Sequence, residues 1–524
     1  MAYIGFVGSG HVGNFSSTGT LELVYPAQRN AGRKATVETA GVVAWYFSTG
    51  AAWTIIQAGP QIMTLPGDFD WTPSFNVLRS SAGQYDVSIT AESLRPSVGT
   101  LTTYYSFPLT GLNTNNGLTP ATAFQTVGKA QGNLTSVGTT RVLVYPGTTR
   151  TINGTLGYNG IRPQRNCIVE SCDINGVPDG LPLWFIAGQN AGPPTWTATG
   201  TPNQWTTPIS TSSVTAKVLI DAKLAAQDLT GLTDPLEVVS VADATINGTT
   251  PGSFFQDTAN GLLYFHPADG RNMVGDVYVS TPLVGASLNC YFNVEASMAN
   301  ARRYWLNNCF MVGGNAISGT NGDTATSSTI IPEFVMKGGG FWGATGNGMA
   351  FVGAYDVYLF DVRNMYNGLD GENFHGNTNS TGNVRALMVR SISQARDGYS
   401  GLNIALNTNN NSTGHELCRL IRVMCAYAGS EGRPVHDIQN VHSLMFGGTA
   451  GISASSQLIN ASSNYPNVQA GLAGGEATFI DMYEVTVPQG PNTALSALTG
   501  SAIRCHGMDI TGLTVSGNVT SVAL

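Results

Sequence analysis

The sequence predicts an all-β protein whose main part is a right-handed parallel β-helix, a stack of short strands wound into coils. Only 11% of the 524 residues are charged, glycine is abundant at 64 residues, and short apolar runs alternate with turns rich in Asn, Ser and Thr. A loose repeat in the second half supports the same fold. With 42% hydrophobic residues the chain can bury a core, so disorder is not expected.

Charge and cysteine content exclude several classes of partner. The formal net charge of −8 argues against nucleic acid, because phosphate binding needs a basic face. The seven cysteines form no CxxC pair or zinc spacing, so we expect free, mostly buried thiols and no metal or cofactor. The first 15 residues lack a signal-peptide pattern, and no apolar run is long enough to span a membrane. We therefore expect a protein that stays in a cell or leaves it within a virus particle.

Residues 1–102 are expected to form a separate β-rich domain. Four strand-like runs, separated by Gly/Pro turns, support it. They cover residues 20–25, 41–48, 53–57 and 85–91.

Residues 103–524 are expected to form the β-helix, which opens with a capping helix. Residues 121–131 form a short amphipathic pattern with Pro120 near its start, where proline is tolerated. An apolar strand over 141–145 follows and ends at Pro146. A helix in this place would cover the open end of the stack, which otherwise exposes core and unpaired strand edges.

Two segments resemble known β-helix proteins. GLNTNNGLTPATAFQTVGKA (111–130), followed by VLVYPGTTRT (142–151), resembles the opening signature of pectate-lyase-like β-helix proteins. PGSFFQDTANGLLYFHPADG (251–270) resembles a hairpin insertion of bacterial and phage β-helix proteins that act on polysaccharides. The resemblance implies a β-helix with a hairpin insertion at about 250–272, and specifies no reaction.

Four segments align as successive coils with a central glycine. They are TGNGMAF (345–351), LDGENFHG (369–376), YSGLNIAL (399–406) and SEGRPVHD (430–437). Strand alternation then predicts an inward column and an outward column. The inward column is Phe351, Phe374, Ile404 and Val435, and the outward one is Val352, His375, Ala405 and His436. The polar runs 377–383 and 407–414 are expected to be surface loops.

Charge is concentrated in the same region. Residues 356–442 hold eight of the 32 acids, seven of the 24 basic residues and four of the seven histidines. In a charge-poor chain this points to a functional site. The alternative is that these arginines and acids pair with one another to stabilise the stack.

Two reactions fit the candidate residues. The residues before the central glycines form a turn column of Asn347, Asp370, Ser400 and Glu431. In this column Asp370 and Glu431 would lie two coils apart, about 9–10 Å at the usual strand spacing, near the roughly 6.5–9.5 Å of inverting glycosidases. Asp397 would lie one coil away. The other reaction is β-elimination on a uronic acid, with His375 or His436 as base and Arg433 as the cation that neutralises the substrate carboxylate. The predicted catalytic residues are Asp370, Glu372, His375, Asp397, Glu431, Arg433 and His436.

The same stretch resembles a subset of phage and bacterial β-helix proteins. The matching segments are DGENFHG (370–376), HELCRLIRV (415–423) and EGRPVHD (431–437). Substrate-binding roles are expected for Arg396, Tyr399, His415, Glu416, Tyr427 and Asp437.

We therefore expect a bacteriophage tailspike-like protein that binds, and cleaves, a bacterial surface polysaccharide. The first domain would attach to other tail proteins, the chain would form a homotrimer, and the protein would belong to the virion tail. Two alternatives stay open. One is a non-enzymatic adhesin or virion structural protein, and the other is a bacterial polysaccharide lyase or hydrolase.

Overall fold

A computed structural model of the chain forms two compact units, Met1–Ser93 and Leu94–Leu524. It describes residues 11–15, 34–39, 42–48, 53–96, 101–132, 139–147, 151–153, 166–186, 195–208, 218–221, 239–267, 269–272, 277–280, 290–293, 303–312, 315–320, 331, 333–342, 347–353, 355–365, 367, 370–376, 384–394, 410–428, 433–451, 468–471, 477–487, 494–497 and 500–524. No helix in these ranges is long and apolar enough to cross a membrane.

The first unit contains a six-stranded sheet in which the strands follow chain order. The strands are β1 (His11–Phe15), β2 (Lys34–Thr39), β3 (Val42–Ser48), β4 (Trp53–Ile62), β5 (Val77–Arg79) and β6 (Tyr85–Val87). A short 3-10 helix, η2 (Glu92–Leu94), follows them. Strands β3, β4 and β6 overlap three of the four expected strands, and the expected strand at 20–25 lies outside the described residues.

The second unit is built on three parallel sheets. The first sheet contains β7 (Leu101–Ser106), β8 (Thr139–Val144), β10 (Cys167–Ser171), β20 (Arg303–Asn307), β23 (Glu333–Lys337), β26 (Asp356–Phe360), β29 (Val384–Val389), β32 (Cys418–Val423), β35 (His442–Phe446), β38 (Phe479–Tyr483), β40 (Ala502–His506) and β42 (Val519–Val522). The second contains β9 (Thr151–Asn153), β11 (Leu183–Ile186), β21 (Cys309–Val312), β24 (Gly340–Trp342), β27 (Arg363–Met365), β30 (Ile392–Gln394), β33 (Ala426–Ala428) and β36 (Thr449–Ala450). The third contains β19 (Cys290–Asn293), β22 (Asn315–Thr320), β25 (Met349–Val352), β28 (Glu372–His375), β31 (Asn410–His415), β34 (Arg433–Ile438), β37 (Val468–Gly471), β39 (Leu495–Ala497) and β41 (Val515–Gly517).

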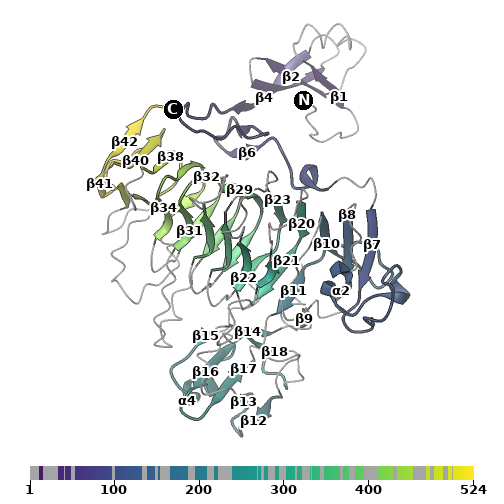
Figure 1. Ribbon diagram of the computed structural model, residues 1–524. Coiled ribbons are helices and arrows are strands. Elements are labelled where there is room, and N and C mark those ends of the chain that lie inside the picture. The colour runs from purple at the N-terminus through teal and green to yellow at the C-terminus, as the bar shows by residue number, and fades with distance from the viewer. Residues whose placement is uncertain are drawn as a thin grey trace. The chain divides into compact units, whose positions relative to one another are not determined.

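The chain visits the three sheets in turn. From β20 to β37 each strand lies in the next sheet of the cycle, so three consecutive strands make one coil (Figure 1). Each strand pairs in parallel with the corresponding strands of the neighbouring coils, for example β23 with β20 and β26. The second unit is therefore almost entirely β structure, arranged as a stack of parallel coils. The right-handed turn of the coils stays a prediction.

The expected helix over 121–131 is wrong in its extent. The segment forms a 3-10 turn, η3 (Pro120–Thr122), and a separate short helix, α2 (Val127–Gly132). The two are separated because Phe124 bonds to β7: its N–H donates to the Tyr105 carbonyl, and its carbonyl accepts from the Phe107 N–H. Helix α2 buries Val127 in the main core beside the first coils.

Between β11 and β19 lies an antiparallel insertion. Strands β16 (Ser253–Asp257) and β17 (Leu262–His266) form a hairpin in the segment where the sequence predicts one. The other elements are β12 (Thr197–Ala198), β13 (Trp205–Pro208), β14 (Val218–Asp221), β15 (Val239–Ser240), α4 (Ala244–Thr249) and β18 (Val277–Ser280). Asp243 caps α4 by accepting a hydrogen bond from the Ile246 N–H.

The core runs through the coils as columns of inward side chains. Phe351 and Phe374 pair in register as predicted, and their rings stack with centroids 6.2 Å apart. The six cysteines whose side chains the structure describes form no disulfide and are buried, as expected.

The predicted alignment fails in the next coil. The strand that pairs with β28 is β31, Asn410–His415, which lies mostly within a run expected to be a surface loop. The inward column is therefore Phe351, Phe374, Gly414 and Asp437, and Val435 lies in the column of Glu372 instead. Ser412 and Thr413 are fully buried. This polar run forms a strand inside the stack because it faces other buried polar side chains there.

Replacing Phe374 with alanine should lower the free energy of unfolding by about 3–5 kcal/mol, since the cavity would lie between two coils. The outward Val352→Ala is the matched control and should cost under about 1 kcal/mol. Denaturant unfolding measures both. Similar small losses for the two variants would contradict the inward column.

Candidate functional site

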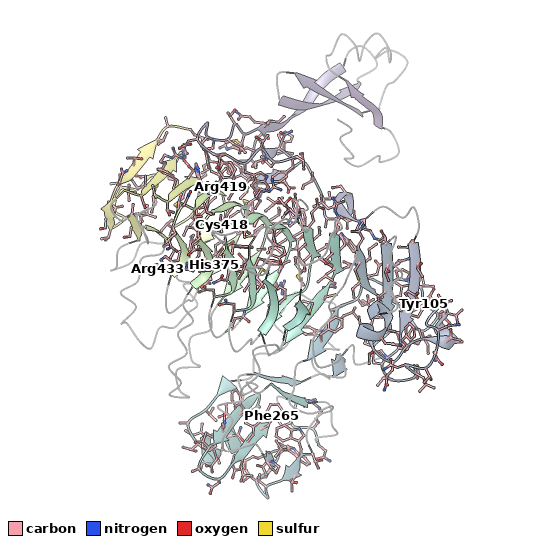
Figure 2. All side chains as sticks on the ribbon, in the orientation of Figure 1. Tyr105, Phe265, His375, Cys418, Arg419 and Arg433 are labelled. Atoms are coloured by element: carbon pink, nitrogen blue, oxygen red, sulfur yellow. The ribbon has the colours of Figure 1, made fainter. Side chains whose placement is uncertain are left out.

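Three histidines lie on one outward surface of the third sheet, in three consecutive coils. His375 ends β28, His415 ends β31 and His436 lies in β34. Their strand neighbours Phe374 and Val435 belong to the core, so alternation points the imidazoles outward. We call His375, His415 and His436 the histidine face; His375 and Arg433 are labelled in Figure 2.

The imidazoles contact one another. The rings of His375 and His415 stack with centroids 4.9 Å apart, and those of His415 and His436 meet edge to face at 6.1 Å. Burial lowers the pKa of His415 to about 4, and the neighbouring His375 adds to the effect. Burial, then Arg433, then His415 lower the pKa of His436 to about 3. At neutral pH both rings are therefore uncharged.

A cation and a carboxylate flank the histidine face. Arg433 Nη1 lies 3.5 Å from His436 Nε2. At the other end, Glu416 Oε2 lies 3.9 Å from His375 Nδ1. The side chains of His375 and Glu416 are 37% and 29% exposed, so this end is open to solvent.

One of the three histidines, His436, also belongs to a row of polar register partners. Asn373, Thr413 and His436 are register partners on β28, β31 and β34. Within the described parts of the chain, Thr413 Oγ1 and His436 Nδ1 are buried and have no hydrogen-bond partner. Buried polar atoms are usually satisfied, so these two atoms leave hydrogen-bonding capacity that the described residues do not use.

Predicted site residues also lie inside the stack. The guanidinium of Arg422 binds both carboxylate oxygens of Asp437 at 2.9 Å, and both side chains are fully buried. Asp437 also accepts hydrogen bonds from Ser443 Oγ at 2.6 Å and the Gly414 N–H at 2.9 Å. Asp437 therefore joins its own strand, β34, to β31, β32 and β35 inside the stack.

Glu372 belongs to the same interior. Its carboxylate accepts hydrogen bonds from Tyr427 Oη at 3.1 Å and Asn364 Nδ2 at 3.0 Å. Burial raises the pKa of Glu372 to about 7, against the opposing effects of Arg422 and the hydrogen bonds. We call the whole set the buried polar cluster. It consists of Asn364, Glu372, Ser412, Arg422, Tyr427, Asp437 and Ser443.

The structure thus divides the predicted site residues. One group comes together on the outer surface, as described above: His375, His415, Glu416, Arg433 and His436. Glu372, Tyr427 and Asp437 are fully buried inside the stack, and their expected catalytic and substrate-binding roles stay predictions. Arg396, Asp397, Tyr399 and Glu431 lie outside the described residues, which leaves the expected Asp370–Glu431 pair a prediction.

Asp370 lies at the turn before β28. Asn347 Oδ1 accepts a hydrogen bond from the Asp370 N–H at 3.0 Å, as expected for residues in one turn column. The Asp370 carboxylate accepts a hydrogen bond from Asn373 Nδ2 at 2.6 Å. Asp370 as a whole is 6% exposed. Asp370 therefore orients the first member of the polar row.

Ion pairing accounts for part of the charge concentration. Arg385 binds Asp356 through two hydrogen bonds of 2.5 and 2.6 Å, and Arg390 binds Asp361 at 2.7 and 3.2 Å. Each pair joins adjacent coils of the stack. With the Arg422–Asp437 pair, these contacts support the alternative interpretation for three of the seven arginines.

A second charged group was missed by the sequence analysis. Asp481 is fully buried and accepts hydrogen bonds from His442 Nε2 at 2.9 Å, Arg504 Nη2 at 2.5 Å and His506 Nε2 at 2.8 Å. Burial alone would raise the pKa of Asp481, but these three hydrogen bonds outweigh burial and lower the pKa. The group ties β35, β38 and β40 together. Only the coil register brings these distant residues together, so no local motif marks them.

The histidine face has the groups for proton abstraction. Uncharged imidazoles accept protons, and a guanidinium neutralises a carboxylate. Among the described residues, no three His, Cys, Asp or Glu side chains are placed to hold a metal ion.

Comparisons with known proteins identify no family. No protein-family model matches the chain, and no curated protein matches it. Two solved structures are weakly similar, each at 8% identity over 80% of this chain. One is described as "Glycoside hydrolase" (TM-score 0.36, 96% of that chain), and the other as a complex of XylC with xylose (TM-score 0.32, 70% of that chain). Similarity at this level shows no shared activity.

Replacing Arg422 with methionine should lower the free energy of unfolding by about 3–5 kcal/mol, because Asp437 would keep an uncompensated buried charge. The double variant Arg422→Met, Asp437→Asn should lose less, since no charge stays unpaired. The exposed Arg390→Met is the control and should cost at most about 1 kcal/mol. A double variant less stable than the single one would contradict this account.

Glu372→Gln should change how stability depends on pH. The folded pKa of Glu372, about 7, lies above the ordinary glutamate value of 4.5. The stability that Glu372 contributes is therefore fully present below pH 4.5 and is lost as pH rises through 7. The loss is at most about 3 kcal/mol. Unfolding of both proteins across this window should show the wild type losing stability relative to Glu372→Gln; parallel curves would refute the shift.

Proposed function

We propose that the protein binds an acidic bacterial surface polysaccharide and cleaves it by β-elimination on the histidine face. The observation that carries the proposal is the set of three contacting imidazoles from consecutive coils, bounded by Arg433 and Glu416. Contacts that continue from coil to coil suit an extended polymer. Among its described residues the histidine face offers three imidazoles, a guanidinium and the carboxylate of Glu416, which favours elimination over hydrolysis by two carboxylates.

His375 is the base in this proposal. It is the most solvent-accessible end of the histidine face, and Glu416 lies beside its Nδ1. The imidazole would remove the C5 proton of a uronic acid residue, and the bond from C4 to the leaving oxygen would break as the C4–C5 double bond forms. Arg433, at the opposite end of the histidine face beside His436, would bind the carboxylate of another uronic acid residue of the polymer.

We also propose the wider setting expected from the sequence. The coils would form a right-handed parallel β-helix of a bacteriophage tailspike-like protein. Residues 1–102 would attach to other tail proteins of the virion, and three copies of the chain would associate. The arrangement of parallel coils supports the β-helix, and the sequence resemblance supports the tailspike role.

The proposal is tested with purified protein on acidic capsular polysaccharides. Cleavage by elimination yields unsaturated uronates, which absorb in the ultraviolet, whereas hydrolysis yields only new reducing ends. His375→Ala should reduce cleavage by about a hundredfold or more, since a positioned base contributes on that scale. His506→Ala, in the Asp481 group, is the control and should keep most activity. No cleavage of a polysaccharide that the protein binds would refute the proposal.

A further inference from the structure

Two loops leave the same edge of the first sheet, in the first coils of the stack. Residues 107–123 follow β7 and residues 172–182 follow β10, and the strand between them, β8, pairs in parallel with both. Ser106 and Ser171, the last residues of β7 and β10, are both register partners of Val144, so the two loops begin side by side. We call residues 107–123 and 172–182 the entry loops.

The entry loops present apolar side chains to solvent. Among the described residues, few other large hydrophobic side chains are similarly exposed, namely Ile246, Val515 and Leu524. Six exposed side chains of this size expose an apolar area on the order of a few hundred Å², which on a monomer is often functional. We call these six the entry patch: Leu109 (73% exposed), Leu112 (58%), Leu118 (51%), Ile174 (60%), Val177 (59%) and Leu181 (38%).

The entry loops form a single surface. Tyr105 and Pro120 pack against the turn at Gly176, where a Cβ would lie 2.4 Å from Tyr105 Cε1 and 2.8 Å from Pro120 Cγ (Tyr105 is labelled in Figure 2). Leu109 packs on Gly147, which follows β8, since a Cβ on that glycine would lie 2.5 Å from Leu109 Cδ1. One small core joins residues of both loops to β8, namely Phe107, Ala123, Leu143 and Cys172.

Hydrogen bonds within each loop fix its shape. In the first loop the Leu112 N–H donates to the Ala123 carbonyl at 3.1 Å. In the second, Asp173 Oδ1 accepts from the N–H groups of Asn175 and Val177 at 2.9 and 2.8 Å. A surface that is already ordered loses little conformational entropy when a partner binds.

The entry loops carry almost no charge. Residues 107–123 contain no Asp, Glu, Lys or Arg, and residues 172–182 contain only Asp173 and Asp179. Asp173 binds its own loop, and Asp179 Oδ1 accepts from Ser171 Oγ at 2.5 Å and from the Leu181 N–H at 3.0 Å. Because the chain has a net charge of −8, two copies repel each other less at this surface than at charged ones.

Several classes of ligand do not suit the entry patch. Its aliphatic side chains offer a sugar neither an aromatic ring nor a hydrogen-bonding group. Nucleic acid and the anionic surface of a membrane are bound by basic side chains, and the entry loops contain none. An apolar protein surface does suit it, and every further copy of this chain presents one. Most soluble oligomers are built from identical chains.

We propose that copies of this chain associate through the entry patch. The apolar side chains of one copy would pack against those of another, which removes both from water. The inference rests on the proposed association of copies and adds the surface that mediates it. The entry patch shares no residue with the histidine face, so association and cleavage can be tested separately.

The test measures the mass of the full chain in solution by analytical ultracentrifugation over a range of concentrations. The wild type should form an oligomer. Leu112→Glu combined with Ile174→Glu should raise the dissociation constant about a hundredfold or more, because each contact would bury unpaired charges. Both residues are more than half exposed, so the double variant should unfold at the same temperature as the wild type.

A second pair, Leu118→Glu with Val177→Glu, tests the same surface independently and should also weaken association. Leu112→Met with Ile174→Val keeps the patch apolar and should associate like the wild type. The matched control is Ile246→Glu, which places a charge on an exposed residue of α4 and should not affect association. A monomeric wild type, or association of both glutamate pairs with wild-type affinity, would overturn the proposal.

The two proposals fail separately. Association that depends on the entry patch, without cleavage of any acidic polysaccharide, would refute elimination on the histidine face and keep the entry patch. A monomeric wild type that cleaves would refute the entry patch alone.

Discussion

The parallel pairing of each strand with the coil above and the coil below determines the rest of this structure. Pairing fixes register, and register places residues from distant parts of the sequence in one column. Phe351 and Phe374 stack for this reason, and so do His375 and His415. Register also decides which side chains enter the core, because a shift of one residue would move every inward side chain of a strand to the outer surface. Every site discussed above is a set of register partners or their close neighbours.

Register separates two kinds of charge that look alike in the sequence. Glu372 and His375 are three residues apart, yet one is sealed in the interior and the other is open to solvent. Their chemistry differs accordingly: Glu372 binds Tyr427 and Asn364, whereas His375 faces Glu416. Concentration of charge therefore marked a region that contains both the solvent-exposed histidine face and the buried polar cluster, but it could not distinguish the two. That distinction depends on whether a side chain points into the stack or out of it, which is known only once the strand pairing is known.

The sequence was sufficient to predict β structure in parallel coils, the Phe351–Phe374 pair and the Asn347–Asp370 turn column. It was not sufficient for β31, because Asn, Ser and Thr are typical of loops unless a buried charge needs their hydrogen bonds. Ser412 meets that need by accepting from Arg422. The Asp481 group was missed for a related reason, since its members come from three coils with no shared spacing. Tertiary hydrogen bonding, which local patterns do not encode, explains both errors.

The buried polar cluster has a consequence for how such a repetitive fold reaches one structure. Apolar coils resemble one another, so strands can pair with the wrong neighbour at little energetic cost. The Arg422–Asp437 pair lies within one coil, but it also hydrogen-bonds to Ser412 and Gly414 of the preceding coil and to Ser443 of the next one. Pairing with a wrong coil would therefore leave buried charged groups without these partners. The cluster therefore gives the middle of the stack a unique identity during folding. Interior charges of this kind favour a single register of the stack.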